Sequence, residues 1–137
     1  MQGKFICHKD FENLKPIDVF HKELSPNQTE KHAENLYNRH TLFRKKVVLG
    51  KASKAILKIT ADDYFKLYIN GVYVTQGPPP SYPNHYYFME IDVTSFLKDG
   101  VNTFAVHNYY QGLINRVWVS GDLRSMFWCE LYLDGKI

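Results

Sequence analysis

A chain of 137 residues with a formal net charge of +3 is long enough for one domain with a single core, and its scattered charge argues against a nucleic-acid-binding protein. Hydrophobic residues make up 45% of the chain and charged residues 23%, which excludes an intrinsically disordered protein. Aromatic residues reach 15% of the sequence, a proportion that suits pleated sheets and also sites that stack on sugar rings.

Residues 1–40 are polar and irregular, so we expect an N-terminal arm that wraps around the rest of the chain. The arm is expected to hold a short strand at 5–7 and one or two helical turns within 26–38. Isolated apolar residues are expected to anchor it: Phe11, Leu14, Ile17, Val19 and Phe20. No apolar run of signal-peptide length follows Met1 and no stretch approaches a membrane span, so we expect a cytoplasmic protein without a membrane partner.

From residue 41 onward, apolar and polar side chains alternate with a period of two, the pattern of strands that place one face on a core. We expect strands at 41–49, 55–61, 64–69, 72–74, 86–93, 102–109, 113–120 and 124–133. About eight short strands without a long helix predict an antiparallel β-sandwich of the jelly-roll type.

Turn residues separate these strands. Asn70-Gly71 predicts a type I′ hairpin, because such a turn needs a positive φ at both central residues. The prolines between 78 and 83 predict an exposed, stiff loop, since proline supplies no donor to a sheet. Residues 94–100 predict a short helical turn with Thr94 as its N-cap and Gly100 in the left-handed conformation after it.

The two cysteines lie far apart in the sequence, and neither belongs to a C-x-x-C motif. Cys7 and Cys129 can pair only if the two ends of the chain meet. Cys129 shares the apolar phase of its strand with Phe127 and Leu131, so we expect it to be a reduced residue of the core.

Three stretches, in their order along the chain, resemble a known family. "TLFRKKVVL", "KAILKITADDYFKLYINGVYV" and "YYFMEIDVTSFLKDGVNTFAV" resemble the N-terminal β-sandwich domain of bacterial α-L-rhamnosidases. The shared features are a strand opening with Phe-Arg-Lys, a strand ending in Asn-Gly, and Asp-Val-Thr followed by Leu-Lys-x-Gly-x-Asn. The same layout occurs loosely in the sugar-binding domain of β-galactosidases and β-glucuronidases. The resemblance covers residues 41–133.

This resemblance implies a galactose-binding-domain-like jelly roll at 41–137, preceded by the arm at 1–40. It also implies that the chain is one part of a larger glycoside hydrolase, whose catalytic carboxylates lie in a separate (α/α)6 barrel. That barrel would then be the partner of this domain, and a rhamnose-containing glycan its ligand. The final stretch "ELYLDGKI" ends inside an expected strand or hairpin, which favours a fragment of a multidomain enzyme.

No catalytic site is expected in these residues. Glycoside hydrolysis needs two carboxylates about 5–10 Å apart across the scissile bond. Asp62 and Asp63 are adjacent on an expected strand and would point to opposite faces, so a role in a turn or cap is the better interpretation. The six histidines lack metal-ligand spacing, and no nucleotide-binding fingerprint occurs, so neither a metal nor a cofactor is expected.

Displayed aromatic rings and neighbouring polar side chains are the candidates for carbohydrate binding or for an interface. They are Asp62, Asn70, Tyr82, Tyr86, Tyr87, Asn108, Tyr109, Tyr110, Trp118, Trp128 and Tyr132. Asn70 also has a purely local interpretation as a turn residue. Trp118, Trp128 and Tyr132 have another, in which they line a second interface or pack on the barrel domain. Three functions stay open: a non-catalytic rhamnosidase module, a free-standing carbohydrate-binding module, and the sugar-binding domain of a β-galactosidase-type enzyme.

Overall fold

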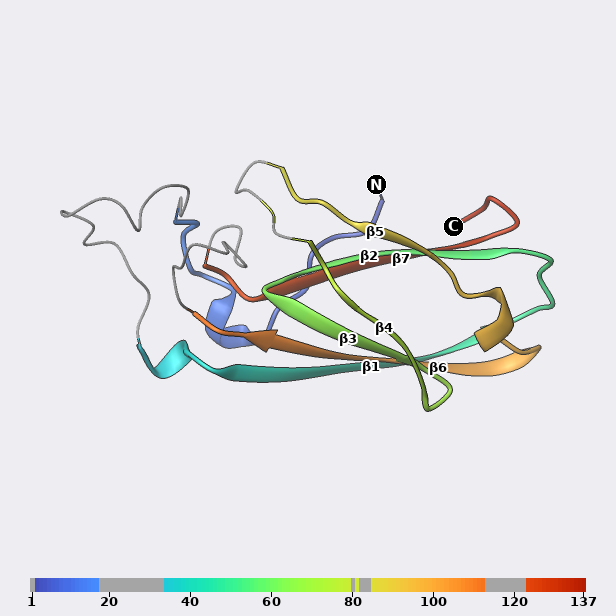
Figure 1. The fold of residues 1–137 in the computed structure, drawn as a ribbon, viewed down its shortest axis with the longest axis horizontal. Helices are drawn as coiled ribbons and strands as arrows, with labels where there is room; N and C mark the ends of the chain where they lie inside the picture. Colours follow the sequence, from blue (N-terminus) through green and yellow to red (C-terminus); the bar gives the residue numbers. More distant parts are fainter. Residues whose placement is uncertain (1, 18–33, 80, 82–84, 113–122) are drawn as a thin grey trace.

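The computed structural model describes residues 2–17, 34–79, 81, 85–112 and 123–137, which form two antiparallel sheets packed face to face (Figure 1). In these residues, one sheet has the strand order β1-β6-β3-β4 and the other β5-β2-β7. The strands are β1 (Arg39–Leu49), β2 (Ala55–Asp62), β3 (Tyr64–Ile69), β4 (Val72–Gly77), β5 (Met89–Asp92), β6 (Gly100–Tyr110) and β7 (Met126–Leu133). The predicted all-β sandwich is confirmed.

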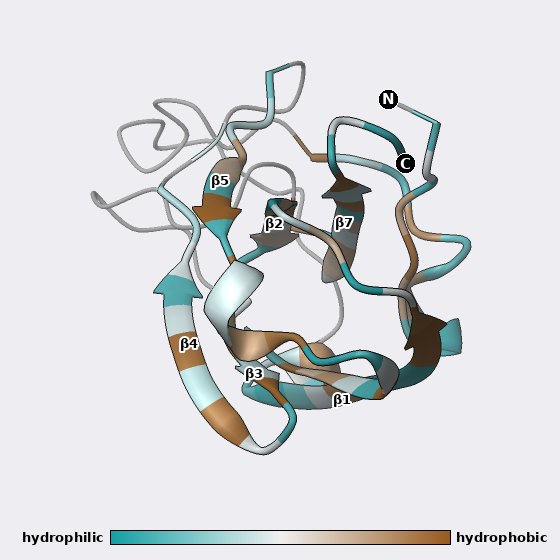
Figure 2. Cartoon of the chain, turned by 90° about the vertical axis from the view of Figure 1, so that its right-hand side faces the viewer, coloured by the Kyte–Doolittle hydropathy of each residue, from teal (hydrophilic) through white to brown (hydrophobic). Residues whose placement is uncertain are grey.

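The core lies between the two sheets, which Figure 2 shows as two layers, and it consists of side chains on the apolar phase of the strands. Its most buried members are Ala55, Leu57, Ile59, Ala61, Phe65, Leu67, Ile69 and Val93, each with at most 2% of its surface exposed. This follows the period-two alternation of the sequence, because successive side chains of a strand point to opposite faces. None of the helices in the described ranges is long and apolar enough to cross a membrane.

The hairpin between β3 and β4 turns at Asn70 and Gly71, whose φ angles of 53° and 84° are both positive. The predicted type I′ signal is therefore confirmed. The Asn70 side chain is fully engaged, since its Nδ2 donates to the carbonyl of Phe96 and to Asn102 Oδ1, both at 2.9 Å. Its Oδ1 accepts from the Thr103 N–H at 3.0 Å. Asn70 is thus a turn residue with a positive φ, as its local interpretation predicts, and its side chain also joins the hairpin to β6.

The short helical turn after β5 is a 3-10 helix, η4 (Thr94–Phe96). The prediction of Thr94 as its N-cap is wrong, because Val93 occupies that position and makes no side-chain cap. The Thr94 hydroxyl instead donates to Asp92 Oδ1 at 2.6 Å and accepts from the Ala55 N–H at 2.8 Å, which ties η4 to the start of β2. Gly100 has the predicted positive φ, 90°, and begins β6.

The strand expected at 86–93 is shorter, and only β5 forms. The backbone around Tyr87 is held by side chains instead of a strand ladder. The Tyr87 carbonyl accepts from the Thr60 hydroxyl at 2.6 Å, and its N–H donates to Ser81 Oγ at 3.1 Å. The strand expected at 113–120 lies outside the described residues.

The N-terminal arm packs on one end of the sandwich. The expected strand at 5–7 is a single bridge, in which Ile6 and Phe127 exchange two backbone hydrogen bonds of 2.9 Å. Phe11, in the 3-10 helix η1 (Lys9–Phe11), packs edge-on against the Tyr110 ring. Within the described residues, the arm also includes the 3-10 helix η3 (Glu34–Leu36). The anchoring roles of Phe11, Leu14 and Ile17 are confirmed, and Val19 and Phe20 lie outside the described residues.

Glu130 on β7 holds the beginning of this arm. Its Oε1 accepts from the N–H groups of Gln2 and Gly3, the second at 2.6 Å, and its Oε2 accepts from the Tyr132 hydroxyl at 2.8 Å. These hydrogen bonds, that of Gly3 first, lower the pKa of the Glu130 carboxyl. A carboxyl whose pKa is lower in the folded protein than in the unfolded protein contributes stability at pH values above its unfolded pKa. This contribution is lost as the pH falls through the folded pKa.

We therefore expect the free energy of unfolding to decrease on acidification from about pH 5 to about pH 3, and Glu130→Gln to make this decrease less steep. Part of the decrease should remain in the variant, because the pKa values of Asp92 and Asp134 are also lowered by hydrogen bonds. Urea unfolding of both proteins across this pH range measures it. Equal steepness in the two proteins would rule out the assigned role of Glu130.

The sandwich is open along the side between β1 and β7. A groove of about 490 Å³ enters there between the sheets, lined mainly by apolar side chains of both. Cys129 lies on its wall, so the prediction of a buried core cysteine is wrong: the residue has the inward phase but is exposed. The apolar walls still raise the pKa of its thiol to about 11. Cys7 and Cys129 are both free thiols.

Candidate binding surface

The outer face of the four-stranded sheet, which we define as the face turned away from β5-β2-β7, carries rows of side chains set by the strand register. Directly paired residues of antiparallel strands point to the same side. One row therefore runs His40–Tyr109–Tyr64, and the next runs Leu42–His107–Lys66–Gln76. The sequence alternation predicted which residues face outward on each strand, and the register places them side by side.

The rings of the first row stack across the strands. The His40 and Tyr109 rings lie 4.7 Å apart with an interplanar angle of 21°, and the Tyr64 and Tyr109 rings lie 6.4 Å apart at 12°. A diagonal contact joins the two rows, since His40 Nδ1 and His107 Nε2 are 2.8 Å apart. One imidazole must donate the hydrogen to the other at this distance, so both cannot be protonated without losing the bond.

A hollow of about 560 Å³ lies over these rows and extends to β4. Its lining combines aromatic rings with polar and charged side chains: His40, Tyr64, Lys66, Gln76, His107 and Tyr109, together with Phe65, Gly77 and Pro78. We call the first six of these residues the His–Tyr patch. Ring faces beside a few hydrogen-bonding groups are the chemistry of a site for a polar, ring-shaped ligand or for a polar protein surface.

We expect His107 to titrate below its ordinary pKa of 6.5, because burial, the neighbouring His40 and the charge of Lys66 all disfavour its protonated form. His40→Asn should bring the pKa of His107 closer to the ordinary value. NMR titration of the imidazole ring protons in both proteins checks this. A His107 that titrates above 6.5 in the unsubstituted protein would contradict the geometry of the pair.

The same outer face also exposes large apolar side chains beside the His–Tyr patch and beyond it. Leu42 and Val48 on β1 are each 78% exposed, and Val101 on β6 is 52% exposed. Val48 and Val101 are directly paired across the two strands. Exposed apolar side chains gathered on one face are typical of a surface that contacts another protein or domain.

A second group of polar residues lies buried at the end of β2 and β6. Asp62 is fully buried and accepts from the Tyr86 hydroxyl at 3.0 Å. Asp63, 1% exposed, accepts from the Gln111 N–H at 2.7 Å. Asn108 Nδ2 donates to the Asp62 carbonyl at 3.3 Å and to Ser125 Oγ at 3.0 Å.

The structure thus brings together three predicted site residues, Asp62, Tyr86 and Asn108, but buries the polar atoms of Asp62 and Asn108 among strand ends. The carboxyls of Asp62 and Asp63 bond to different neighbours and are enclosed by protein. Asp62 is 0% and Asp63 is 1% exposed, so a substrate in solvent does not reach either carboxyl. Their hydrogen bonds instead join the end of β2 to the segment before β5 and to the end of β6.

The expectation that Tyr110 and Trp128 display their rings is wrong. Tyr110 is 0% exposed and donates its hydroxyl hydrogen to the Leu123 carbonyl at 2.7 Å. Trp128 is 1% exposed, and Phe88 packs against its ring at 5.9 Å. A Cβ added to Gly3 would lie 3.1 Å from Trp128 Nε1. The strand phase of Trp128 predicted only that its ring leaves the main core, whereas Gly3 of the arm and Phe88 cover it. Tyr110 was expected to be displayed because it lies near a turn, but it shares the buried phase of β6 with Val106 and Asn108, and Phe11 of the arm packs on its ring.

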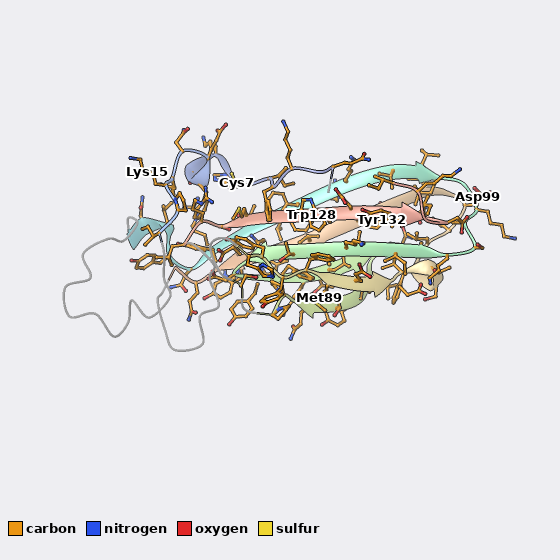
Figure 3. The ribbon with its side chains drawn as sticks, turned by 90° about the horizontal axis from the view of Figure 1, so that it is seen from above. Cys7, Lys15, Met89, Asp99, Trp128 and Tyr132 are labelled. Carbon is orange, nitrogen blue, oxygen red and sulfur yellow. The ribbon has the colours of Figure 1, made fainter. Side chains whose placement is uncertain are left out.

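Tyr132 lies on β7 beyond Trp128 (Figure 3) and is half-buried. Its ring is occupied by a neighbouring cation, since Lys58 Nζ lies 5.1 Å from its centroid. Lys58 also lies 5.4 Å from the Phe88 ring and forms an ion pair of 2.6 Å with Glu90. Tyr132 therefore belongs to a packed network on the other sheet, in line with its interpretation as an interface or packing residue.

Four predicted residues remain, and two of them lie within the described ranges. Tyr109 is part of the His–Tyr patch, and its hydroxyl donates to Asn38 Oδ1 at 2.8 Å. Tyr87 is 45% exposed and packs edge-on against His85. Tyr82 and Trp118 lie outside the described residues.

Sequence reasoning missed most of the His–Tyr patch: His40, Tyr64, Lys66, Gln76 and His107. The outward phase of each was visible in the alternation of its strand. Their proximity depends on β6 lying between β1 and β3, which local patterns do not contain. In the residues with assigned positions, no three His, Cys, Asp or Glu side chains gather as metal ligands.

No family model and no curated protein matches this chain. Solved structures do match. The GH78 family rhamnosidase of Bacillus sp. GL1 is similar with a TM-score of 0.68 and 28% identity, over 80% of this chain and 11% of that chain. The α-L-rhamnosidase of Aspergillus terreus is similar with a TM-score of 0.57 and 23% identity, over 78% of this chain and 14% of that one.

β-Glucuronidase 2 of Bacteroides uniformis is also similar, with a TM-score of 0.51 and 21% identity over 73% of this chain and 13% of that one. At these identities, the Aspergillus and Bacteroides proteins share the fold alone. The chain spans between 11% and 14% of the length of each of these three enzymes. The predicted resemblance is confirmed: in fold and in sequence, this chain is similar to a β-sandwich domain of GH78 α-L-rhamnosidases.

Proposed function

We propose that this chain acts as a non-catalytic β-sandwich module of an α-L-rhamnosidase-like glycoside hydrolase and packs on the (α/α)6 catalytic barrel of that enzyme. The observation that carries the proposal is the match of 80% of this chain, at 28% identity, to only 11% of the Bacillus rhamnosidase. A module of this kind acts by position: it buries a surface against the catalytic domain and helps to form one wall of the substrate entrance.

The outer face of the four-stranded sheet is the surface that we assign to this packing. It exposes Leu42, Val48 and Val101 beside the His–Tyr patch, which combines an apolar contact area with hydrogen-bonding groups. Interfaces between domains of one chain have this mixed composition. The enclosed carboxyls of Asp62 and Asp63 support a role without catalysis.

Binding in trans tests the proposal. A Bacillus sp. GL1 rhamnosidase that lacks its matched segment is mixed with this chain, and association is measured by calorimetry. We expect binding that Leu42→Glu weakens at least about tenfold, because a charge would be placed in an apolar contact. Ile137→Glu is the matched control, since Ile137 is exposed but does not belong to the outer face. Equal loss from both variants, or no association, would contradict the assignment.

A carbohydrate-binding role is the second candidate, and the hollow over the His–Tyr patch favours it. The Tyr64 ring, 39% exposed, lies there beside Lys66 and Gln76, so an apolar ring face and polar groups meet in one space. Adding rhamnose, and galactose as a comparison, should shift the NMR signals of the His107 ring if this candidate is right. Trp128 is buried, so its fluorescence would not report on this hollow.

A further inference from the structure

The four-stranded sheet is basic, whereas the other sheet carries acidic side chains. Within the described strands, β1, β3, β4 and β6 contain no aspartate or glutamate. The strands of the β5-β2-β7 sheet carry Asp62, Glu90, Asp92 and Glu130. Three cations of the four-stranded sheet have the outward phase, and none forms an ion pair within the described part of the chain: Arg44, Lys46 and Lys66. The outer face therefore favours an anionic ligand.

The ring of Tyr64 gives the hollow over the His–Tyr patch a face on which a ring-shaped ligand can lie. Tyr109 has a ring on each side, His40 at 4.7 Å and Tyr64 at 6.4 Å. Tyr64 is the last ring of this row, so its other face is turned toward β4, where Gln76 and Pro78 also line the hollow. An aromatic face beside polar groups suits a ligand with one apolar and one polar side, as a sugar ring has.

Positive charge lies within reach of that ring face. Lys66 follows Tyr64 by two residues on β3, so both side chains point to the outer face, about 7 Å apart along the strand. Lys66 is directly paired with His107, and both residues line the hollow. No carboxylate of the described residues lines it. A ligand on Tyr64 can therefore place a negatively charged group beside Lys66 and His107.

The His40–His107 pair keeps a hydrogen-bond donor available to such a ligand. One hydrogen lies between His40 Nδ1 and His107 Nε2, which leaves His40 Nε2 and His107 Nδ1 as the remaining ring nitrogens. In the neutral pair one of these two carries a hydrogen, and one added proton supplies the other without breaking the shared bond. The ionisable groups around the pair on this face carry no negative charge near neutral pH: Lys66, Tyr64 and Tyr109, with Arg44 in the next row.

We propose that the hollow over the His–Tyr patch binds a uronic acid residue of a glycan, with its ring on Tyr64 and its carboxylate bonded to Lys66 and the His40–His107 pair. This assignment rests on the carbohydrate-binding candidate and names its ligand class. A neutral sugar would lose the charge-assisted hydrogen bonds, which are roughly twice as strong as neutral ones. A carboxylate without a ring would leave the face of Tyr64 uncovered.

The glycan and the catalytic domain would use different parts of the outer face. Val48 and Val101 lie near the ends of β1 and β6 that are farthest from His40 and Tyr109. His40 and Val48 are separated by about 25 Å along β1. Uronate binding in the hollow therefore does not compete with an apolar contact at Val48 and Val101.

NMR titration of the full chain with D-galacturonate tests the proposal. D-Galactose is the matched neutral sugar, because the two differ only at C6, where a carboxylate replaces a hydroxymethyl group. We expect galacturonate to shift the ring signals of Tyr64 and His107 and to bind at least about tenfold more tightly than galactose. Galacturonate should also raise the pKa of His107, because an anion favours its protonated form, and galactose should leave this pKa unchanged.

Two variants and one further anion separate the contributions. Lys66→Gln should reduce the difference in affinity between the two sugars to less than about threefold. Lys9→Gln should leave the difference unchanged, because Lys9 is an exposed lysine of η1 that does not line the hollow. Acetate at equal ionic strength should bind at least about tenfold more weakly than galacturonate, since it has no ring to lie on Tyr64.

The outcomes that contradict the proposal are distinct. Equal affinities for galactose and galacturonate would overturn it and leave the carbohydrate-binding candidate standing. Equal affinities for acetate and galacturonate would overturn it too, because the ring would then contribute nothing. A tetraglutamate peptide that binds more tightly than galacturonate would identify an acidic protein surface as the occupant instead. Absence of binding by both sugars would overturn the proposal and the carbohydrate-binding candidate together. The titrations use this chain alone, so packing on a catalytic domain can fail separately.

Discussion

Asn102→Ala is expected to lower the free energy of unfolding by about 3 kcal/mol, because it removes the centre of a buried hydrogen-bond network. Asn102 is 0% exposed. Its Nδ2 donates to the carbonyls of Lys98 and Gly100 at 2.7 and 3.1 Å. Its Oδ1 accepts from the Lys98 N–H at 3.0 Å and from Asn70 Nδ2 at 2.9 Å. Alanine would leave these partners without their bonds in a place that water reaches poorly.

The same network joins η4, β6 and the β3–β4 hairpin, so its loss should loosen the whole end of the sandwich that holds β1 against β6. Asn35→Ala is the matched control, because Asn35 is an exposed asparagine in η3. We expect it to change the free energy by less than about 0.5 kcal/mol. Urea unfolding of the three proteins measures both values. An Asn102→Ala protein as stable as Asn35→Ala would show that the network contributes little.

Leu67→Ala is expected to cost about 3 kcal/mol, because it opens a cavity between the two sheets. Leu67 on β3 is 1% exposed and belongs to the core that both sheets share. It also lines the inner end of the groove between β1 and β7. Truncation there removes contacts with both layers and cannot be compensated by collapse of a single strand.

Leu42→Ala provides the matched comparison for this prediction. Leu42 has the same side chain on β1 but points to the outer face, where it is 78% exposed. Its replacement should change the free energy of unfolding by less than about 0.5 kcal/mol. Thermal or urea unfolding distinguishes the two. A Leu42→Ala protein that loses as much stability as Leu67→Ala would contradict the assignment of inner and outer faces.

Local patterns in the sequence were sufficient to predict most of the strands and the β3–β4 turn. Leu57, Phe65 and Leu67 follow strict alternation, and a strand has only two faces, so the pattern identifies the core side. Asn70-Gly71 carries its own conformational signal. These features depend on neighbours in the sequence, which explains why they could be predicted without coordinates.

The candidate site depended on contacts between distant segments, and the sequence predicted less of it. Trp128 has the outward phase of β7, but the arm and Phe88 cover it. Cys129 has the inward phase, but it lies on an outer strand of its sheet and is exposed. His40 and His107 meet because β1 and β6 are adjacent. The sheet order and the path of the arm determine whether each of these residues is buried, exposed or in contact. A local sequence pattern predicts neither the sheet order nor the path of the arm.

Hydrolysis of an aryl α-L-rhamnoside by the purified chain, with the Bacillus sp. GL1 rhamnosidase as a positive control, tests the central claim most directly. We expect no release of the aryl group above the buffer rate, because the two adjacent carboxyls of the described residues, Asp62 and Asp63, are buried and bonded within the sandwich. Turnover by this chain that Asp62→Asn or Asp63→Asn abolished would contradict the account of a non-catalytic module.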